Sequence, residues 1–180
     1  DLDGIYFDDM NWGSHGDESP HYPSCCCPYC EKLFREETSL KIPTKVDFDS
    51  IDFRRFVNWR YEKMRAFMLH VARRIREKHP DAIVDYNHYA LHQADWSIGH
   101  PANPLHLETV GAYFFMEANE VQDGPSFIGK VGRAYGSPFA LWRGVWQVLP
   151  ECVNSSAPYA EPLSPTLRGL STLANGGATF

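Results

Sequence analysis

The sequence lacks any uninterrupted apolar run near the ~20 residues that a membrane-spanning helix requires. It also lacks a dense basic segment, because its 17 Lys and Arg are dispersed among 23 Asp and Glu, for a formal net charge of −6. Nucleic-acid binding depends on a concentrated positive face, so we expect neither a nucleic-acid partner nor a membrane partner. Internal repeats, low-complexity tracts and linker-like stretches are missing as well, which favours a single domain over residues 1–180.

The sequence starts without Met and without a signal-like segment, so its first residues do not indicate a compartment. Its 180 residues are 43% hydrophobic and 14% aromatic, which is sufficient for a sizeable globular core. Five cysteines are present, and four of them fall within residues 25–30. Such clustering suits a metal site better than a disulfide framework, and it favours a reducing compartment such as the cytoplasm.

Cys25, Cys27 and Cys30 form a C-x-C-x-x-C pattern that lets three thiolates converge from one tight turn. Zinc accepts such sulfur ligands at ~2.3 Å in tetrahedral geometry, and a fourth ligand completes the site. We therefore predict a structural zinc at these three cysteines and no organic cofactor. Cys26 lies between ligands and is interpreted as a bystander. Cys152 lies far along the chain and is interpreted as a lone structural cysteine unless the fold returns it to the cluster. The alternative for the whole cluster is a set of small buried apolar residues.

Short apolar segments alternate with amphipathic ones along the chain. Strands are predicted at residues 5–7, 82–87, 110–117, 139–142 and 176–180, and helices at residues 28–38, 53–79 and 164–174. Asp49, Ser50 or Asp52 is expected to cap the long helix, and Pro80 to end it. Alternation of this kind predicts an α/β fold with a parallel sheet and outer helices. A complete (β/α)8 TIM barrel needs ~200 residues or more. We therefore expect the C-terminal portion of such a barrel, from about its fourth strand to its eighth.

The segment Asp3-Gly4-Ile5-Tyr6-Phe7-Asp8-Asp9, followed by Cys25-x-Cys27-x-x-Cys30-Glu31-x-x-Phe34-Arg35, resembles barrel-type glycoside hydrolases. The nearest are the family-42 β-galactosidases and related glycosyl hydrolases assigned by homology. The resemblance extends through the long helix to Leu173-Ala174-Asn175-Gly176-Gly177. It implies a TIM barrel that hydrolyses a glycosidic bond in a carbohydrate substrate. It also implies zinc bound by the three cysteines, with a fourth Cys upstream of residue 1.

The end of the first strand departs from the β-galactosidase pattern. In those enzymes the fourth strand ends in Asn-Glu, with the Glu as acid/base, whereas this chain has Asp8 and Asp9. The same strand is also similar to the fourth strand of α-L-fucosidase-type barrels, in which the Asp after an aromatic pair is the nucleophile. Asp8 holds the matching position, so this resemblance implies Asp8 as a catalytic carboxylate.

Two carboxylates are predicted to perform the chemistry. Side chains alternate along a strand, so Asp8 and Asp9 face opposite ways, and Asp8, which shares a face with the small Gly4, is the better candidate to point inward. Its alternative role is to cap a loop. Glu117 ends an apolar run, where desolvation would raise the pKa of its carboxyl, as a general acid near neutral pH requires. Glu120 is the fallback, and a structural ion pair with Arg143 is the alternative role of Glu117.

Further side chains at or near predicted strand ends are candidates for sugar binding. Aromatic faces stack on the apolar face of a sugar ring, and polar side chains hydrogen-bond its hydroxyl groups. The predicted substrate-binding residues are Asp9, Trp12, Asn87, His88, Trp142 and Arg143. Trp96, Trp146 and His92 occupy similar positions. Each tryptophan has a core role as its alternative, and each histidine a structural one.

Two other functions remain open. A non-catalytic carbohydrate-binding or assembly module would keep the same fold and zinc, and its exposed strand edges would favour a homo-oligomer. A metal-dependent hydrolase would instead use Asp8, Asp9, His15 and His21 as ligands of a catalytic ion. Metal content distinguishes these functions, because Asp8→Asn would remove metal only from the metal-dependent hydrolase.

Overall fold

The computed structural model describes residues 3–8, 25–88, 114–117, 124–134, 136, 139–142, 169–170 and 172–179. Five strands form one sheet: β1 (Gly4–Phe7), β2 (Ile83–His88), β3 (Phe114–Glu117), β4 (Phe139–Trp142) and β5 (Ala178–Thr179). Their spatial order is β1-β2-β3-β4-β5 and every pairing is parallel. The order in space therefore follows the order in sequence, and the carboxyl ends of all five strands lie along one edge.

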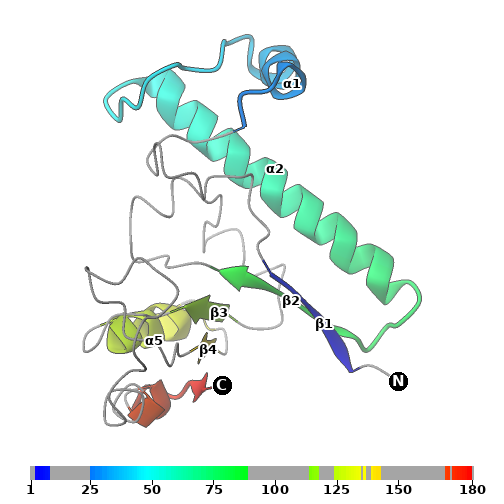
Figure 1. Cartoon of the computed structure of the whole chain (residues 1–180), viewed down its shortest axis with the longest axis vertical. Coiled ribbons are helices and arrows are strands. Elements are labelled where there is room, and N and C mark those ends of the chain that lie inside the picture. The colour runs from blue at the N-terminus through cyan, green and yellow to red at the C-terminus, as the bar shows by residue number, and fades with distance from the viewer. Residues whose placement is uncertain are drawn as a thin grey trace, which may run out of the picture.

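The described helices beside the sheet are α1 (Pro28–Thr38), α2 (Ile51–Arg76) and α5 (Gly124–Ala134), and residues 169–170 and 172–174 are helical as well (Figure 1). Ser50 caps α2, because its hydroxyl accepts a hydrogen bond from the backbone N–H of Phe53 at 3.4 Å. At the end of α1, Ser39 adopts a left-handed conformation with φ 61° and donates its N–H to the carbonyl of Arg35. These local signals set the bounds of the two helices that flank the loop at residues 39–50.

The predicted strands coincide with the observed ones at their cores, and α1 has the predicted bounds. The long helix begins two residues earlier than predicted and ends at Arg76. The prediction was wrong between β3 and β4, where no helix was expected and α5 lies. The three glycines of α5 disfavour a helix by propensity. Two of them, Gly129 and Gly132, are buried on one face, where their small size permits close packing.

Helix α2 covers one face of the sheet at β1 and β2. The Tyr86 hydroxyl donates a hydrogen bond to the carbonyl of Met68 in α2 at 2.7 Å, and the Tyr86 ring stacks on Phe7 with centroids 5.4 Å apart. Burial raises the pKa of Tyr86 to about 12, so its hydroxyl stays protonated. Since neighbours in register face the same way, Tyr6 and Asp85 belong to the opposite face. Helix α2 therefore covers the face of the sheet that carries Tyr86 and not the face that carries Tyr6 and Asp85.

Removing the Tyr86 hydroxyl should measurably destabilise the contact between α2 and the sheet. Tyr86→Phe keeps the ring and its stacking on Phe7 but deletes a buried hydrogen bond. Such bonds contribute about 0.5–1.5 kcal/mol, so the free energy of unfolding should fall by that amount. Urea denaturation followed by circular dichroism checks this. An unchanged midpoint would mean that the hydroxyl contributes nothing to this packing.

Helices α1 and α2 pack through an aromatic cluster of Phe34, Phe56 and Trp59, whose rings lie 5.3–6.2 Å apart between centroids. Ile42 completes the buried cluster, and Cys30 packs against it. The Trp59 indole N–H donates to a carboxylate oxygen of Glu37 at 2.6 Å, and Lys63 pairs with the same carboxylate. Contacts from Cys30 in the first turn to Glu37 in the last turn thereby hold α1 against the N-terminal half of α2.

Within the described part of the chain, no helix has both the length and the apolar character needed to cross a membrane.

Candidate functional site

The cysteine turn is built into the start of α1. Cys27 is the N-cap residue of the helix, with extended backbone angles of φ −70° and ψ 159°, and Pro28 follows in the first turn. The Cys27 sulfur accepts a hydrogen bond from the backbone N–H of Cys30 at 3.4 Å. Proline suits this position because its fixed φ is helical and its missing N–H has no partner there in any case. The helix start thus turns the sulfur atoms of Cys27 and Cys30 toward each other.

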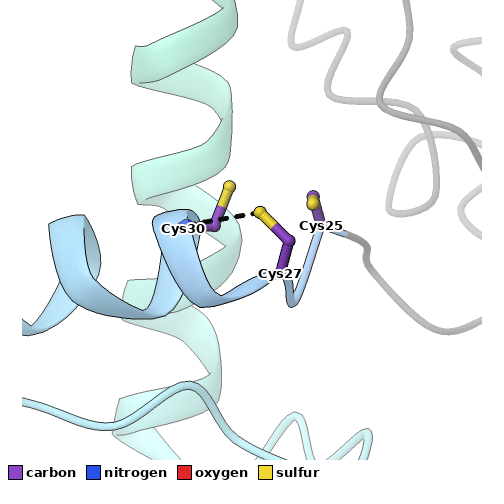
Figure 2. A group of neighbouring side chains, drawn as sticks. All are labelled: Cys25, Cys27 and Cys30. Atoms are coloured by element: carbon purple, nitrogen blue, oxygen red, sulfur yellow. Dashed lines mark hydrogen bonds between the residues drawn. The ribbon is translucent and has the colours of Figure 1, made fainter.

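The three predicted ligands converge. The sulfur atoms of Cys25, Cys27 and Cys30 all lie within 4.8 Å of one another (Figure 2). Three thiolates on tetrahedral zinc at ~2.3 Å would be about 3.8 Å apart, so metal binding requires shifts of only about 1 Å. The cluster can therefore hold a metal ion. Among the described residues, no other group of three His, Cys, Asp or Glu side chains is arranged in this way.

Cys27 and Cys30 differ in their environment. Cys27 is exposed, and the hydrogen bond from the Cys30 N–H, with further ones from the thiols of Cys25 and Cys30, lowers the pKa of Cys27 to about 7. Cys30 is half-buried, and desolvation together with its two sulfur neighbours raises the pKa of Cys30 to about 12. A divalent cation would favour the deprotonated form of all three thiols, so metal binding should release protons.

Arg60 is the unexpected member of this region. It projects from α2, is 0% exposed, and its guanidinium carbon lies 6.0 Å from the centroid of the Phe56 ring. Burial lowers the pKa of Arg60 to about 10, while Tyr61 and the cysteines at positions 26, 25 and 30 act in the opposite direction. Arg60 therefore stays cationic at neutral pH, close to the thiols. Three thiolates on a divalent ion carry one net negative charge, which this guanidinium would balance.

The second region is the carboxyl edge of the sheet. Asp8 directly follows β1 and is exposed, Asn87 and His88 end β2, and Glu117 ends β3. Trp142 ends β4 and pairs in register with Glu117. The backbone therefore brings five of the predicted site residues to one edge, on four consecutive strands.

The strand register divides these residues into two alternating sets. Asp85 pairs with Tyr6, and Asn87 pairs with Phe115, so Asp8, Asp85, Asn87, Glu117 and Trp142 fall in one set of positions. This set is opposite to the one that includes Tyr86 and faces α2. His88 falls in the other set, next to Met116 in register. The position of Asp8 therefore belongs to the set that alternates away from the helix.

Asp85 was not among the functional residues predicted from the sequence. Its side chain is 1% exposed, in the middle of β2 between the buried residues Val84 and Tyr86. A carboxylate within a buried apolar strand is costly, and such groups concentrate at functional sites. The signal available in the sequence was one acidic residue inside Ile83-Val84-Asp85-Tyr86.

The other predicted residues lie outside the described part of the chain. They include Asp9, Trp12 and Arg143 of the predicted sugar site, and Glu120, the fallback carboxylate. His15 and His21 of the alternative catalytic metal site, and Cys152, lie outside it as well. Their predicted roles stay predictions.

Searches of protein-family models, of curated proteins and of solved structures return no match to this chain. The assignment of a function therefore depends on the chemistry of the two regions described above.

Proposed function

We propose that this chain is part of a TIM-barrel glycoside hydrolase that cleaves a glycosidic bond with Asp8 and Glu117. The observation that carries the proposal is their common location. Asp8 directly follows β1 and Glu117 ends β3, at the same edge of one parallel sheet, and both fall in the alternating set of positions opposite to α2. Parallel α/β barrels place catalytic groups at this edge, where the loops after the strands meet.

The strand order also supports a barrel. Open doubly wound sheets reverse their strand order at a switch point, whereas barrel strands follow one another in sequence. The five strands here have the order β1-β2-β3-β4-β5 without reversal. Right-handed crossovers would then place the helices on one face and leave the other for a barrel interior. The location of α2 on the face of Tyr86 is in agreement with this arrangement.

The separation of the two strands suits a pair of carboxylates that act on one bond. Adjacent strands lie about 4.8 Å apart, so β1 and β3, with β2 between them, are about 9.6 Å apart. Inward-facing side chains in a barrel approach one another more closely than their backbones do. Carboxyl groups ~5 Å apart give retention of the anomeric configuration, and groups ~6.5–9.5 Å apart give inversion. In either case Glu117 protonates the leaving oxygen, and Asp8 attacks the sugar or activates water.

The residues between and beside the two carboxylates would bind the sugar. Asn87 ends the strand between them, and Trp142 is the register neighbour of Glu117. An amide there offers both a donor and an acceptor to a sugar hydroxyl. The indole offers an apolar surface for the less polar face of the ring.

The metal in the cysteine cluster is proposed to be zinc with a structural role. Cys25, Cys27 and Cys30 would hold it, and sulfur ligands of this number favour zinc over magnesium or calcium. The ion would fix the first turn of α1 against α2, next to the aromatic cluster that includes Phe34 and Phe56. The chemistry at the sheet edge would not involve it.

The direct test of the function is a turnover assay on a panel of aryl α- and β-glycosides, with an aryl phosphate and an aryl ester as controls. We expect hydrolysis of at least one glycoside and of neither control. Binding of a carbohydrate without any turnover would instead indicate the non-catalytic module. Turnover of a control that depends on added metal and is lost in Asp8→Asn would indicate the metal-dependent hydrolase.

A further inference from the structure

Cys27 and Cys30 have the arrangement of a reactive thiol pair as well as that of metal ligands. They are separated by two residues at the start of α1, and their sulfur atoms lie within 4.8 Å of each other. A disulfide requires a sulfur separation of ~2.05 Å, which side-chain rotation within a single helical turn can supply. Figure 2 shows the two side chains turned toward each other, with the Cys30 N–H directed at the Cys27 sulfur.

The two thiols differ in access. Cys27 is exposed at the helix N-terminus, where the backbone N–H of Cys30 stabilises negative charge on its sulfur. Cys30 is less exposed and packs against the cluster of Phe34, Phe56 and Trp59. An incoming molecule therefore meets Cys27 first. Cys26 is also exposed, but it does not belong to the group of converging sulfur atoms, so it serves as a natural internal control.

Cys27 is the N-cap residue of α1, and cysteines at helix N-termini are among those that react with disulfides.

We propose that Cys27 and Cys30 form a dithiol–disulfide couple that exchanges with low-molecular-weight disulfides, with Cys27 as the attacking thiol and Cys30 as the resolving thiol. The Cys27 thiolate attacks one sulfur of R–S–S–R, forms Cys27–S–S–R and expels R–S⁻. Cys30, after losing its proton to solvent, attacks the Cys27 sulfur and expels the second R–S⁻. The two protein thiols are oxidised to one disulfide, and one small disulfide is reduced to two thiols.

The couple concerns the same cysteines as the proposed zinc site but does not depend on zinc or on glycosidase activity. A metal bound to the thiolates would compete with the oxidant, because each sulfur lone pair serves one partner at a time. Oxidation would remove two of the three ligands and release the ion. The metal content of the cluster would then depend on the ratio of thiols to disulfides in the surrounding solution.

The test uses the purified protein, both as isolated and after treatment with a chelator, exposed to oxidised glutathione for increasing times. Acid-quenched samples are analysed by peptide mapping and intact mass. We expect an intramolecular Cys27–Cys30 disulfide in the wild type and in the control Cys26→Ser, formed faster after chelation. Cys30→Ser should instead accumulate a glutathione adduct on Cys27, about tenfold faster than on Cys26. Zinc release should follow disulfide formation in the untreated sample.

Several outcomes would overturn the proposal. They are a disulfide that joins Cys27 to any cysteine other than Cys30, equal rates of adduct formation at Cys26 and Cys27, or no disulfide in the chelated wild type. The wild-type mapping decides the question even if Cys30→Ser fails to fold, which circular dichroism would reveal. Zinc content measured before chelation tests the zinc proposal separately.

Discussion

Glycoside turnover should fall by about 10²- to 10⁴-fold in Glu117→Gln, and on the order of 10⁴-fold in Asp8→Asn. An amide at position 117 cannot donate the proton that a departing oxygen requires. An amide at position 8 cannot attack the sugar or activate water. The two losses should also differ with the leaving group. Glu117→Gln should retain far more activity on substrates with an acidic leaving group, because these depart without protonation, whereas Asp8→Asn should lose activity on all of them.

Stability measurements distinguish catalysis from a structural role. Asp8 is exposed, and exposed substitutions change the free energy of unfolding by about 0.5 kcal/mol or less. Asp8→Asn should therefore keep its melting temperature while losing turnover. Asp81→Asn is the matched control, since Asp81 is exposed at the opposite edge of the sheet, before β2. If a variant loses activity only as much as it loses folded protein, the residue replaced in it does not belong to the catalytic pair.

Replacing a cysteine of the cluster should lower metal content and stability together. Cys27→Ser and Cys30→Ser each remove one of three converging sulfur ligands. Loss of a residue that only hydrogen-bonds to a metal ligand lowers metal affinity by up to about 100-fold. Loss of a ligand itself should lower the zinc affinity of these variants by more than that. Structural zinc sites couple binding to folding, so the melting temperature should fall in both variants and respond little to added zinc. Elemental analysis per chain and thermal unfolding with and without zinc check these expectations.

Cys26→Ser is the control for this series. Cys26 is exposed and lies outside the converging group, so its replacement should leave one zinc per chain and an unchanged melting temperature. Asp8→Asn should also retain the metal. Full zinc content in Cys27→Ser would contradict the assignment of Cys27 as a ligand. Loss of metal in Asp8→Asn would favour a catalytic ion at the sheet edge.

Local sequence signals predicted the elements that depend on local interactions. Pro28 and Cys27 define the start of α1, and Ser50 caps α2, so the bounds of both helices follow from their own residues. Helix α5 was missed because its glycines oppose helix formation in isolation, and tertiary packing of Gly129 and Gly132 outweighs that propensity. The barrel, the zinc and the glycosidase activity stay predictions.

Arg60 and Asp85 were not predicted as buried residues, for the same physical reason. Arg60 lies in an amphipathic helix and Asp85 in an apolar strand, and the identity of a charged residue does not reveal whether its side chain is buried. Arg60 is fully buried although it lies in an amphipathic helix, and Asp85 is buried in a strand whose register neighbour is Tyr6 of β1. Such effects arise from contacts between segments distant in sequence, which hydrophobic periodicity does not encode.

The most direct test of the proposed glycosidase is chemical rescue of Asp8→Ala and Glu117→Ala by azide, with the anomeric configuration of the product read by proton NMR. If Asp8 is the nucleophile, azide should restore turnover in Asp8→Ala and give a glycosyl azide of inverted configuration. In Glu117→Ala, azide should restore turnover of substrates with acidic leaving groups and give the retained configuration. Wild-type turnover in both variants without azide would contradict the account.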